Sequence, residues 1–108
     1  MTQIRSVSVI GAGQMGSGIA HVCALAGYDV RLHDLDRTKI DAGLEVIRGN
    51  LTRQAGRGII TDAQIGEALG RIAPSESLEE TGSADLVIEA ATENEDVKKA
   101  ILIGRAHV

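Results

Sequence analysis

The apolar and polar positions of the first 34 residues predict a strand, a helix and a second strand. Strands are expected over Ile4–Ile10 and Val30–Asp34, where Val and Ile suit a sheet that is buried on both faces. Residues Gln14–Ala26 carry apolar side chains at helical spacing, and Gly27 follows as a C-terminal cap. A helical crossover of this kind makes the two strands parallel. The stripe expected to face the sheet consists of Met15, Ile19, Val22, Cys23 and Ala26.

Two helices, rather than one, are expected between the second and third strands. The first begins at Arg37, and the segment Ala55–Gly58 ends it. Thr61 and Gln64 have the spacing of a capping box for the second helix, which reaches Leu69. The inner stripe of the first helix, at positions i, i+4, i+7 and i+11, comprises Ile40, Leu44, Ile47 and Leu51.

Two further strands are expected, of unequal strength. A short one over Arg71–Ala73 is ended by Pro74, as suits an edge strand. Ser77 and Glu80 predict a second capping box, for a single helical turn. The strand over Asp85–Ala90 is the clearer of the two.

Another helix is expected from Thr92 onward. Together the elements predict an α/β fold, a Rossmann-type parallel sheet of strand order 3-2-1-4 with a two-helix arm between strands 2 and 3.

Composition indicates one domain whose core is built from aliphatic side chains. The 108 residues are 44% hydrophobic, with no Trp or Phe, and Tyr28 is the one aromatic residue. The net charge of −4 is scattered, which argues against nucleic acid as a partner. No apolar run approaches the ~20 residues of a membrane span, and no signal peptide is recognised. The expected location is the cytoplasm. A single cysteine, Cys23, excludes an internal disulfide and a cysteine-based metal cluster.

The junction between the first expected strand and the helix contains three glycines, Gly11, Gly13 and Gly16. In a βαβ unit, glycines at this spacing permit a sharp bend, let the backbone approach a pyrophosphate, and let the helix pack close to the strand. The cofactor phosphates would then lie on the turn and on the helix amino end, a segment that also includes Ala12, Gln14 and Met15. The alternative is a plain tight turn without a ligand.

Asp34 closes the second strand 18 residues after Gly16, near the spacing of about 20 expected for a ribose-binding carboxylate. A carboxylate there accepts hydrogen bonds from both adenosine ribose hydroxyls and repels a 2′-phosphate, which favours NAD over NADP. Arg37 nearby weakens that inference. The alternative is that Asp34 simply ends a strand.

The stretches VIGAGQMGSGIA, AGYDVRLHD and DLVIEAATENEDVKKAI, with the two-helix arm, resemble the NAD-dependent 3-hydroxyacyl-CoA dehydrogenases, which include the 3-hydroxybutyryl-CoA dehydrogenases. The resemblance implies reversible hydride transfer between C3 of a 3-hydroxyacyl-CoA and the nicotinamide, with the arm near the acyl-CoA. It also implies that Glu93 and Lys98 line the nicotinamide half of the NAD site. The alternatives are a carboxylate at a helix start for Glu93 and a solvated side chain for Lys98.

The resemblance stops at about Leu102. The family continues through further strands, a catalytic His–Glu pair and a C-terminal helical domain, whereas this chain ends in IGRAHV. We therefore expect a partial NAD-binding domain over residues 1–102 and an unmatched tail over residues 103–108. No catalytic residue is expected in this chain, His107 included, and it is predicted to be inactive alone. The uncovered fourth strand predicts a homo-oligomer.

Structural roles are expected for the remaining candidate side chains, namely His21, His33 and Cys23. Two other functions stay open: a non-catalytic nucleotide-binding or assembly module, and the NAD-binding part of a beta-hydroxyacid dehydrogenase or an imine reductase. The long helical arm argues against the latter pair. The genomic reading frame beyond Val108 would distinguish an enzyme from a non-catalytic module.

Overall fold

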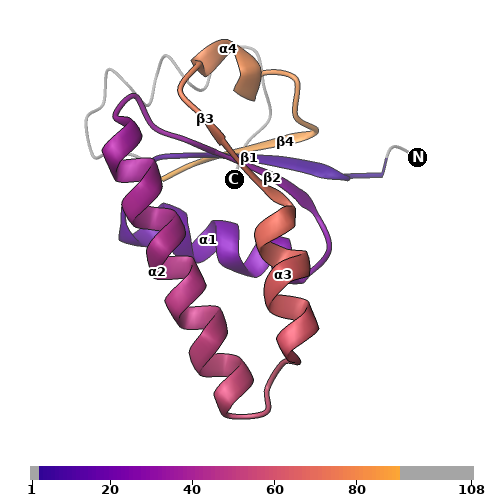
Figure 1. Ribbon diagram of the computed structural model, residues 1–108. Helices are drawn as coiled ribbons and strands as arrows, with labels where there is room; N and C mark the ends of the chain where they lie inside the picture. The colour runs from indigo at the N-terminus through magenta and orange to yellow at the C-terminus, as the bar shows by residue number, and fades with distance from the viewer. Residues whose placement is uncertain (1–2, 91–108) are drawn as a thin grey trace.

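The computed structural model describes residues 3–90, in which four parallel strands form one sheet with helices on both faces (Figure 1). The strand order β3-β2-β1-β4 is the predicted one. Each strand pairs in parallel with its neighbour, as Val9 with Leu32 and with Ile88 illustrates. The strands are β1 (Ser6–Ile10), β2 (Asp29–His33), β3 (Ile72–Ser75) and β4 (Leu86–Glu89). The predicted helix from Thr92 and the expected boundary at residue 102 lie outside the described residues.

Three helices cover one face of the sheet, and a single turn lies on the other (Figure 1). Helices α2 and α3 lie side by side and extend away from the sheet as an arm, as predicted from their spacing. None of the helices between residues 3 and 90 has both the length and the apolar character needed to cross a bilayer. The helices are α1 (Gln14–Leu25), α2 (Arg37–Gly56), α3 (Asp62–Gly70) and α4 (Leu78–Thr81).

The main core lies between the sheet and helices α1, α2 and α3. Its largest fully buried apolar side chains are Leu32 of β2 and three residues of the predicted α2 stripe, Ile40, Ile47 and Leu51. The fourth stripe residue, Leu44, is half-buried against the same cluster. Full burial of such a side chain contributes about 1.5–3 kcal/mol. The packing of α2 is therefore the main support for the arm.

The predicted inner stripe of α1 is wrong for three of its five residues: Ile19 and Cys23 pack against the core, whereas Met15, Val22 and Ala26 are exposed. Met15 and Val22 are 68% and 66% exposed, and the buried positions are Gly16, Ser17, Ala20, His21 and Ala24. The cause is the close approach of α1 to the sheet, since a Cβ added at Gly16 would stand 1.6 Å from the Gly11 carbonyl oxygen. Only small side chains fit beneath a helix at that distance, so larger apolar residues are displaced to its flanks and outer face.

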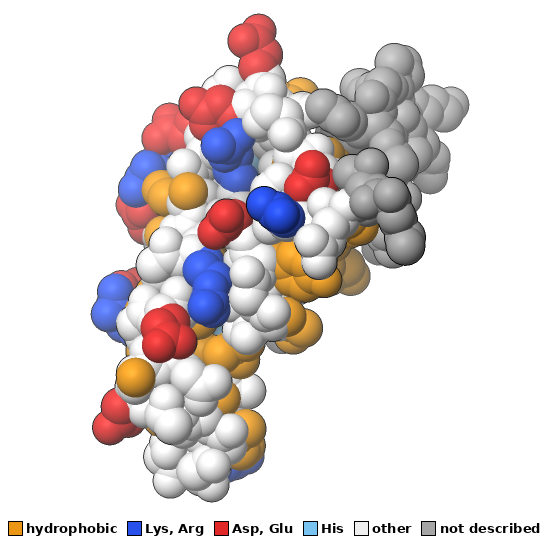
Figure 2. Space-filling view, turned by 90° about the vertical axis from the view of Figure 1, so that its right-hand side faces the viewer, with side chains coloured by type: hydrophobic (Ala, Val, Ile, Leu, Met, Phe, Trp, Pro, Cys, Tyr) orange, Lys and Arg blue, Asp and Glu red, His pale blue; other side chains and the backbone are white. Residues whose placement is uncertain are grey.

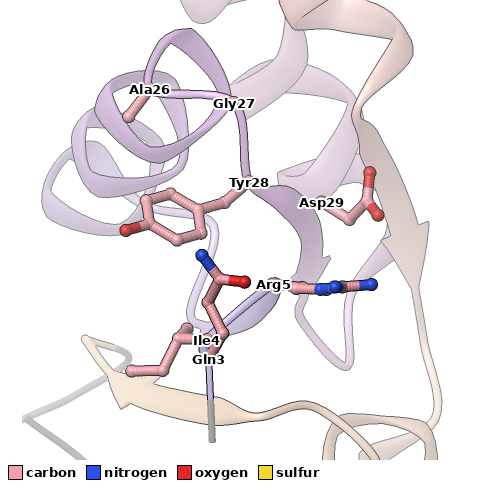
Figure 3. A pocket seen from close by; sticks show the side chains of 7 residues that line it. All are labelled: Gln3, Ile4, Arg5, Ala26, Gly27, Tyr28 and Asp29. Atoms are coloured by element: carbon pink, nitrogen blue, oxygen red, sulfur yellow. The ribbon is translucent and has the colours of Figure 1, made fainter. Parts of the chain in front are cut away.

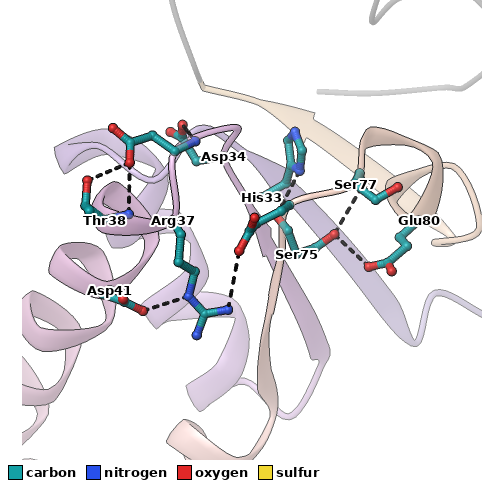
Figure 4. A network of polar contacts seen from close by, with 10 residues as sticks. His33, Asp34, Arg37, Thr38, Asp41, Ser75, Ser77 and Glu80 are labelled. Atoms are coloured by element: carbon teal, nitrogen blue, oxygen red, sulfur yellow. Dashed lines mark hydrogen bonds and ion pairs between the residues drawn. The ribbon is translucent and has the colours of Figure 1, made fainter.

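The two predicted capping boxes differ in outcome. At α3, the Thr61 hydroxyl accepts from the Gln64 N–H, and the Gln64 side chain accepts from the Thr61 N–H at 2.8 Å. At α4, Ser77 makes no side-chain cap, and the Glu80 carboxylate accepts from the Ser75 hydroxyl at 2.8 Å (Figure 4). The second capping box is therefore wrong.

The two later strands are shifted slightly from their predicted ranges. Pro74 lies inside β3, where it pairs with Leu32, rather than ending the strand. An edge strand tolerates this residue because the missing N–H need not face a partner strand. Asp85 precedes β4, and its carboxylate accepts from the N–H groups of Arg5 and Ser6 at 2.9 and 3.1 Å. These bonds lower the pKa of Asp85 and fasten the start of β4 to the start of β1.

The unequal caps predict unequal effects of two similar substitutions. Thr61→Ala removes a cap that is formed, and we expect it to lower the free energy of unfolding by about 0.5–2 kcal/mol. Ser77→Ala, the matched control, removes a hydroxyl that caps nothing, and we expect a change within about 0.5 kcal/mol. Urea denaturation of both variants measures the difference. Equal losses would contradict the assignment of the two caps.

Candidate functional site at the carboxyl edge of the sheet

The carboxyl ends of the four strands lie in register along one edge of the sheet. Ile10 of β1 pairs with His33 of β2 and with Glu89 of β4, and His33 pairs with Ser75 of β3. Strand order reverses at β1, because β2 lies on one side of it and β4 on the other. In open α/β sheets, ligands bind outside the carboxyl ends of the strands at such a reversal.

The glycine turn joins β1 to α1 at this edge. Gly11 adopts a φ of 107°, a conformation that favours glycine, and its N–H donates to the His33 carbonyl at 2.7 Å. Gly16 lets α1 pack against the turn. Gly13 is exposed, and a Cβ added there would meet no atom within 4 Å. The three glycines thus have the three roles expected from their spacing: bend, open approach and close packing.

The amino end of α1 offers unsatisfied backbone donors next to that open approach. Among residues 3–90 no side chain caps the helix, and its first turn holds no acidic residue. The first N–H groups of a helix have no intrahelical partner, and the helix dipole favours an anion beside them. Gln14 and Met15 in this turn are exposed. The donor set and the space left at Gly13 fit the diphosphate of a dinucleotide.

Asp34 lies directly beside the glycine turn. Its Oδ2 accepts from the Ala12 N–H at 3.1 Å, and its Oδ1 accepts from the Asp36 N–H at 3.0 Å. These bonds hold the carboxylate at the edge of the sheet (Figure 4). The structure therefore brings together the two features that the sequence predicted 18 residues apart, the phosphate turn and the acidic strand end.

Arg37 is occupied by two carboxylates. Its Nε contacts Asp41 at 2.9 Å and its Nη1 lies 3.9 Å from Glu76 (Figure 4). All three side chains are at least half exposed, so the pairs are weak. They nevertheless direct the guanidinium toward Asp41 and Glu76, so that it is less available to bind a 2′-phosphate.

The two described histidines are held in structural contacts. His33 is buried, and its Nδ1 lies 2.9 Å from the Ser75 carbonyl oxygen. His21 is buried between α1 and α2, with its Nε2 at 2.8 Å from the Gln54 side-chain oxygen. Cys23 is half-buried against the core, and burial raises the pKa of its thiol. Structural roles for these side chains agree with the expectation from the sequence.

A hollow of about 390 Å³ between α1 and α2 was not anticipated from the sequence. Arg53 and Arg57 of the arm line it, and the Arg53 guanidinium donates to the Asn50 side-chain oxygen. None of the described residues that line this hollow is acidic. Charge spacing along α2 could have indicated it, since both arginines follow the buried Leu51 within six positions.

A larger hollow of the described residues lies elsewhere. It measures about 910 Å³ and is formed at the amino ends of β1 and β2 by residues that include Gln3, Arg5 and Tyr28 (Figure 3). This is the sheet edge opposite the glycine turn. Volume alone is therefore a poor guide here, because the donors and the carboxylate suited to a dinucleotide lie at the other edge, on an open surface.

The charge distribution and the remaining predicted residues complete the description. On the face shown in Figure 2, acidic and basic side chains are interspersed, without a continuous basic band. Among residues 3–90, no group of His, Cys, Asp and Glu has the arrangement of a metal site. Glu93, Lys98 and His107 lie outside the described residues, so their predicted positions stay predictions.

Comparison with known proteins identifies one family. Residues 6–106 match the sequence profile described as "3-hydroxyacyl-CoA dehydrogenase, NAD binding domain". The chain is 49% identical over 98 residues to the 3-hydroxybutyryl-CoA dehydrogenase of Bradyrhizobium diazoefficiens, covering 91% of this chain and 33% of that protein. It is 44% identical over 92 residues to a probable 3-hydroxybutyryl-CoA dehydrogenase of Bacillus subtilis, covering 85% and 32%. The chain thus spans about one third of the length of these relatives.

The fold agrees with that comparison. The crystal structure of an (S)-3-hydroxybutyryl-CoA dehydrogenase from Ralstonia eutropha superposes with a TM-score of 0.89 at 35% identity. The match covers 97% of this chain and 40% of the other. The two-helix arm is therefore part of a shared domain rather than an isolated addition.

Proposed function

Because the chain belongs to the NAD-binding domain family of the 3-hydroxyacyl-CoA dehydrogenases, we propose that it supplies the cofactor half of an enzyme interconverting 3-hydroxyacyl-CoA and 3-oxoacyl-CoA. The observation that carries this proposal is the Asp34 carboxylate held 3.1 Å from the Ala12 N–H, beside the uncapped end of α1. The bound cofactor would take up the hydride as NAD or supply it as NADH. The residues of this chain bind and orient it.

The cofactor residues divide into three groups by the part of NAD that they would contact. The diphosphate would lie against the backbone of residues 11–16, where the exposed Gly13 leaves room. The adenosine ribose would be held by Asp34, whose ionised oxygens accept from both hydroxyls and repel a 2′-phosphate. We assign Glu93 and Lys98 to the nicotinamide half by resemblance to the family.

An acyl-CoA is the proposed substrate, and the hollow between α1 and α2 suits its phosphates. Coenzyme A carries several phosphate groups, and the guanidinium groups of Arg53 and Arg57 line this hollow without an acidic neighbour. Arginine is well suited to phosphate because its planar donors match the oxygens. The arm would then contact the coenzyme A part of the substrate while the turn holds NAD.

Catalysis itself is assigned to parts of the enzyme that residues 1–108 do not span. A general base must lie within hydrogen-bond reach of the proton that it takes. His21 and His33 are buried, and one ring nitrogen of each is engaged, by the Gln54 side-chain oxygen and by the Ser75 carbonyl oxygen respectively. Residues 1–108 by themselves are proposed to bind NAD in the cytoplasm without turnover.

The first test concerns the cofactor. We expect calorimetry to show tighter binding of NAD than of NADP, and Gly13→Val to abolish NAD binding because its side chain enters the diphosphate position. The fold should be retained, with a free-energy change within about 1 kcal/mol, since a Cβ at this position meets no atom within 4 Å. Gly66→Ala on α3, equally open and remote from the turn, is the matched control.

Two outcomes of these measurements would contradict the proposal. NADP binding as tight as NAD would overturn the role of Asp34. Reduction of acetoacetyl-CoA by NADH that tracks purified residues 1–108, and disappears in Gly13→Val, would overturn the assignment of catalysis to other parts of the enzyme.

The second test concerns the substrate. In the intact enzyme, Arg57→Gln should raise the KM for acyl-CoA about tenfold by removing a charged partner of phosphate. The affinity for NAD should not change. Arg48→Gln is the control, because Arg48 lies on the same helix, is exposed and pairs with Glu45 at 3.8 Å. Equal KM values for the two variants would exclude this hollow as the coenzyme A site.

A third test concerns assembly. Within residues 3–90 no strand pairs with the outer edge of β4, and a sheet edge of this kind invites pairing with a second chain. We therefore propose that residues 1–108 by themselves form a homo-oligomer. Sedimentation at micromolar concentration should give a species heavier than 11.3 kDa. A monodisperse monomer would refute this.

A further inference from the structure

Ala12, inside the glycine turn, is held on both sides by side chains. Its N–H donates to Asp34 Oδ2 at 3.1 Å, and its carbonyl accepts from the Ser17 hydroxyl, also at 3.1 Å. Ala12 and Ser17 are 4% and 2% exposed, so the second bond is shielded from water. A buried hydrogen bond of this kind fixes the orientation of the Ala12 carbonyl, in a turn whose glycines would otherwise leave the backbone free to rotate.

The Ser17 bond sets the direction of the next N–H. The peptide bonds of the described residues are all trans, so the carbonyl of Ala12 and the N–H of Gly13 point in opposite directions. The carbonyl points inward to Ser17, whereas Gly13 is exposed on the open side of the turn. The Gly13 N–H is thereby directed toward the space proposed for the diphosphate.

Gly43 of α2 lies against both partners of this hydrogen bond, the Ser17 hydroxyl and the Ala12 carbonyl. A Cβ added at Gly43 would stand 2.6 Å from the Ser17 hydroxyl oxygen and 2.9 Å from the Ala12 carbonyl oxygen. Gly43 is buried in the middle of a helix, where glycine costs about 1 kcal/mol relative to alanine by propensity alone, which is about a fivefold change in an equilibrium constant. Its lack of a side chain is what lets the arm lie against the turn.

We propose that Ser17 and Gly43 are positioning residues for NAD: Ser17 orients the Ala12–Gly13 peptide toward the diphosphate, and Gly43 keeps the space in which that bond forms. The inference rests on the proposed binding of NAD at the turn. Neither residue would touch the cofactor. Both residues would act through the orientation of the Ala12–Gly13 peptide, which couples the position of the arm to the cofactor site.

Ser17→Ala in the intact protein is the primary test. Loss of the hydroxyl should raise the Kd for NAD and for ADP-ribose, which shares the diphosphate, by about three- to tenfold. The Gly13 amide resonance of the ligand-free protein should also shift. Thr52→Ala is the matched control, since it also removes a hydroxyl that donates to a backbone carbonyl, here that of Arg48 at 2.9 Å within α2. It should change neither quantity.

Gly43→Ala provides an independent test. It should raise the Kd for NAD about tenfold or more, because α2 or the Ala12 carbonyl must shift. Gly49→Ala on the same helix, whose Cβ would meet only Arg53 nitrogens at 3.7 Å or beyond, should bind NAD as the original protein does. Combining Gly43→Ala with Ser17→Ala removes the closer of the two clashes, so the double variant should lose less affinity than the product of the single losses.

The outcomes separate this inference from the proposed function. If the unaltered protein fails to bind NAD, the proposed function falls and this inference with it. If it binds NAD and a folded Ser17→Ala variant binds equally well, or binds more weakly with an unshifted Gly13 amide, the positioning role alone is overturned. Because Ser17→Ala adds no atoms, it decides the matter even where Gly43→Ala fails to fold.

Discussion

The structure depends on one close approach, that of helix α1 to the end of strand β1. At Gly16 even a methyl group has no room, since its carbon would stand 1.6 Å from the Gly11 carbonyl oxygen. A helix this close to the sheet can bury only small side chains beneath it, here Ala20 and Ala24. The same approach brings the uncapped amino end of α1 to the carboxyl edge of the sheet, where its free N–H groups and dipole favour an anion.

The arm extends this close packing to a second helix. Helix α2 supplies Ile40, Ile47 and Leu51 to a core without a Trp or Phe in the chain, so many aliphatic contacts replace a few large rings. Gly43 sits between the first two of these residues and faces the turn rather than the core. One helix face thus anchors the arm, while its later residues Arg53 and Arg57 line a cationic hollow.

The charged residues of the cofactor edge are arranged by hydrogen bonding rather than by burial. Asp34 is held by the N–H groups of Ala12 and Asp36, and Asp36 in turn caps α2 through the Thr38 N–H at 2.9 Å. The hydrogen bond from the Thr38 hydroxyl, together with that cap, lowers the pKa of Asp36. Arg37 is drawn to Asp41 and Glu76. The carboxylate proposed to hold the ribose therefore lies beside an arginine that is already paired, an arrangement that would suit NAD better than NADP.

Much of the fold followed from the sequence alone, because its signals are local. Runs of Val and Ile predicted the strands, the glycine spacing predicted the turn, and the Thr61–Gln64 pair predicted the α3 cap, each from residues a few positions apart. The parallel pairing of β1 and β2 then aligned Asp34 with the turn. What the sequence could not determine were the buried face of α1, the vacant cap at Ser77 and the Ser17–Gly43 contact. The missing cap at Ser77 reflects a competing local bond between Ser75 and Glu80, whereas the other two depend on the distance between elements far apart in the chain. Apolar spacing identifies a helix, but only tertiary packing decides how near it lies to its neighbours, and that distance selects which side chains it can bury.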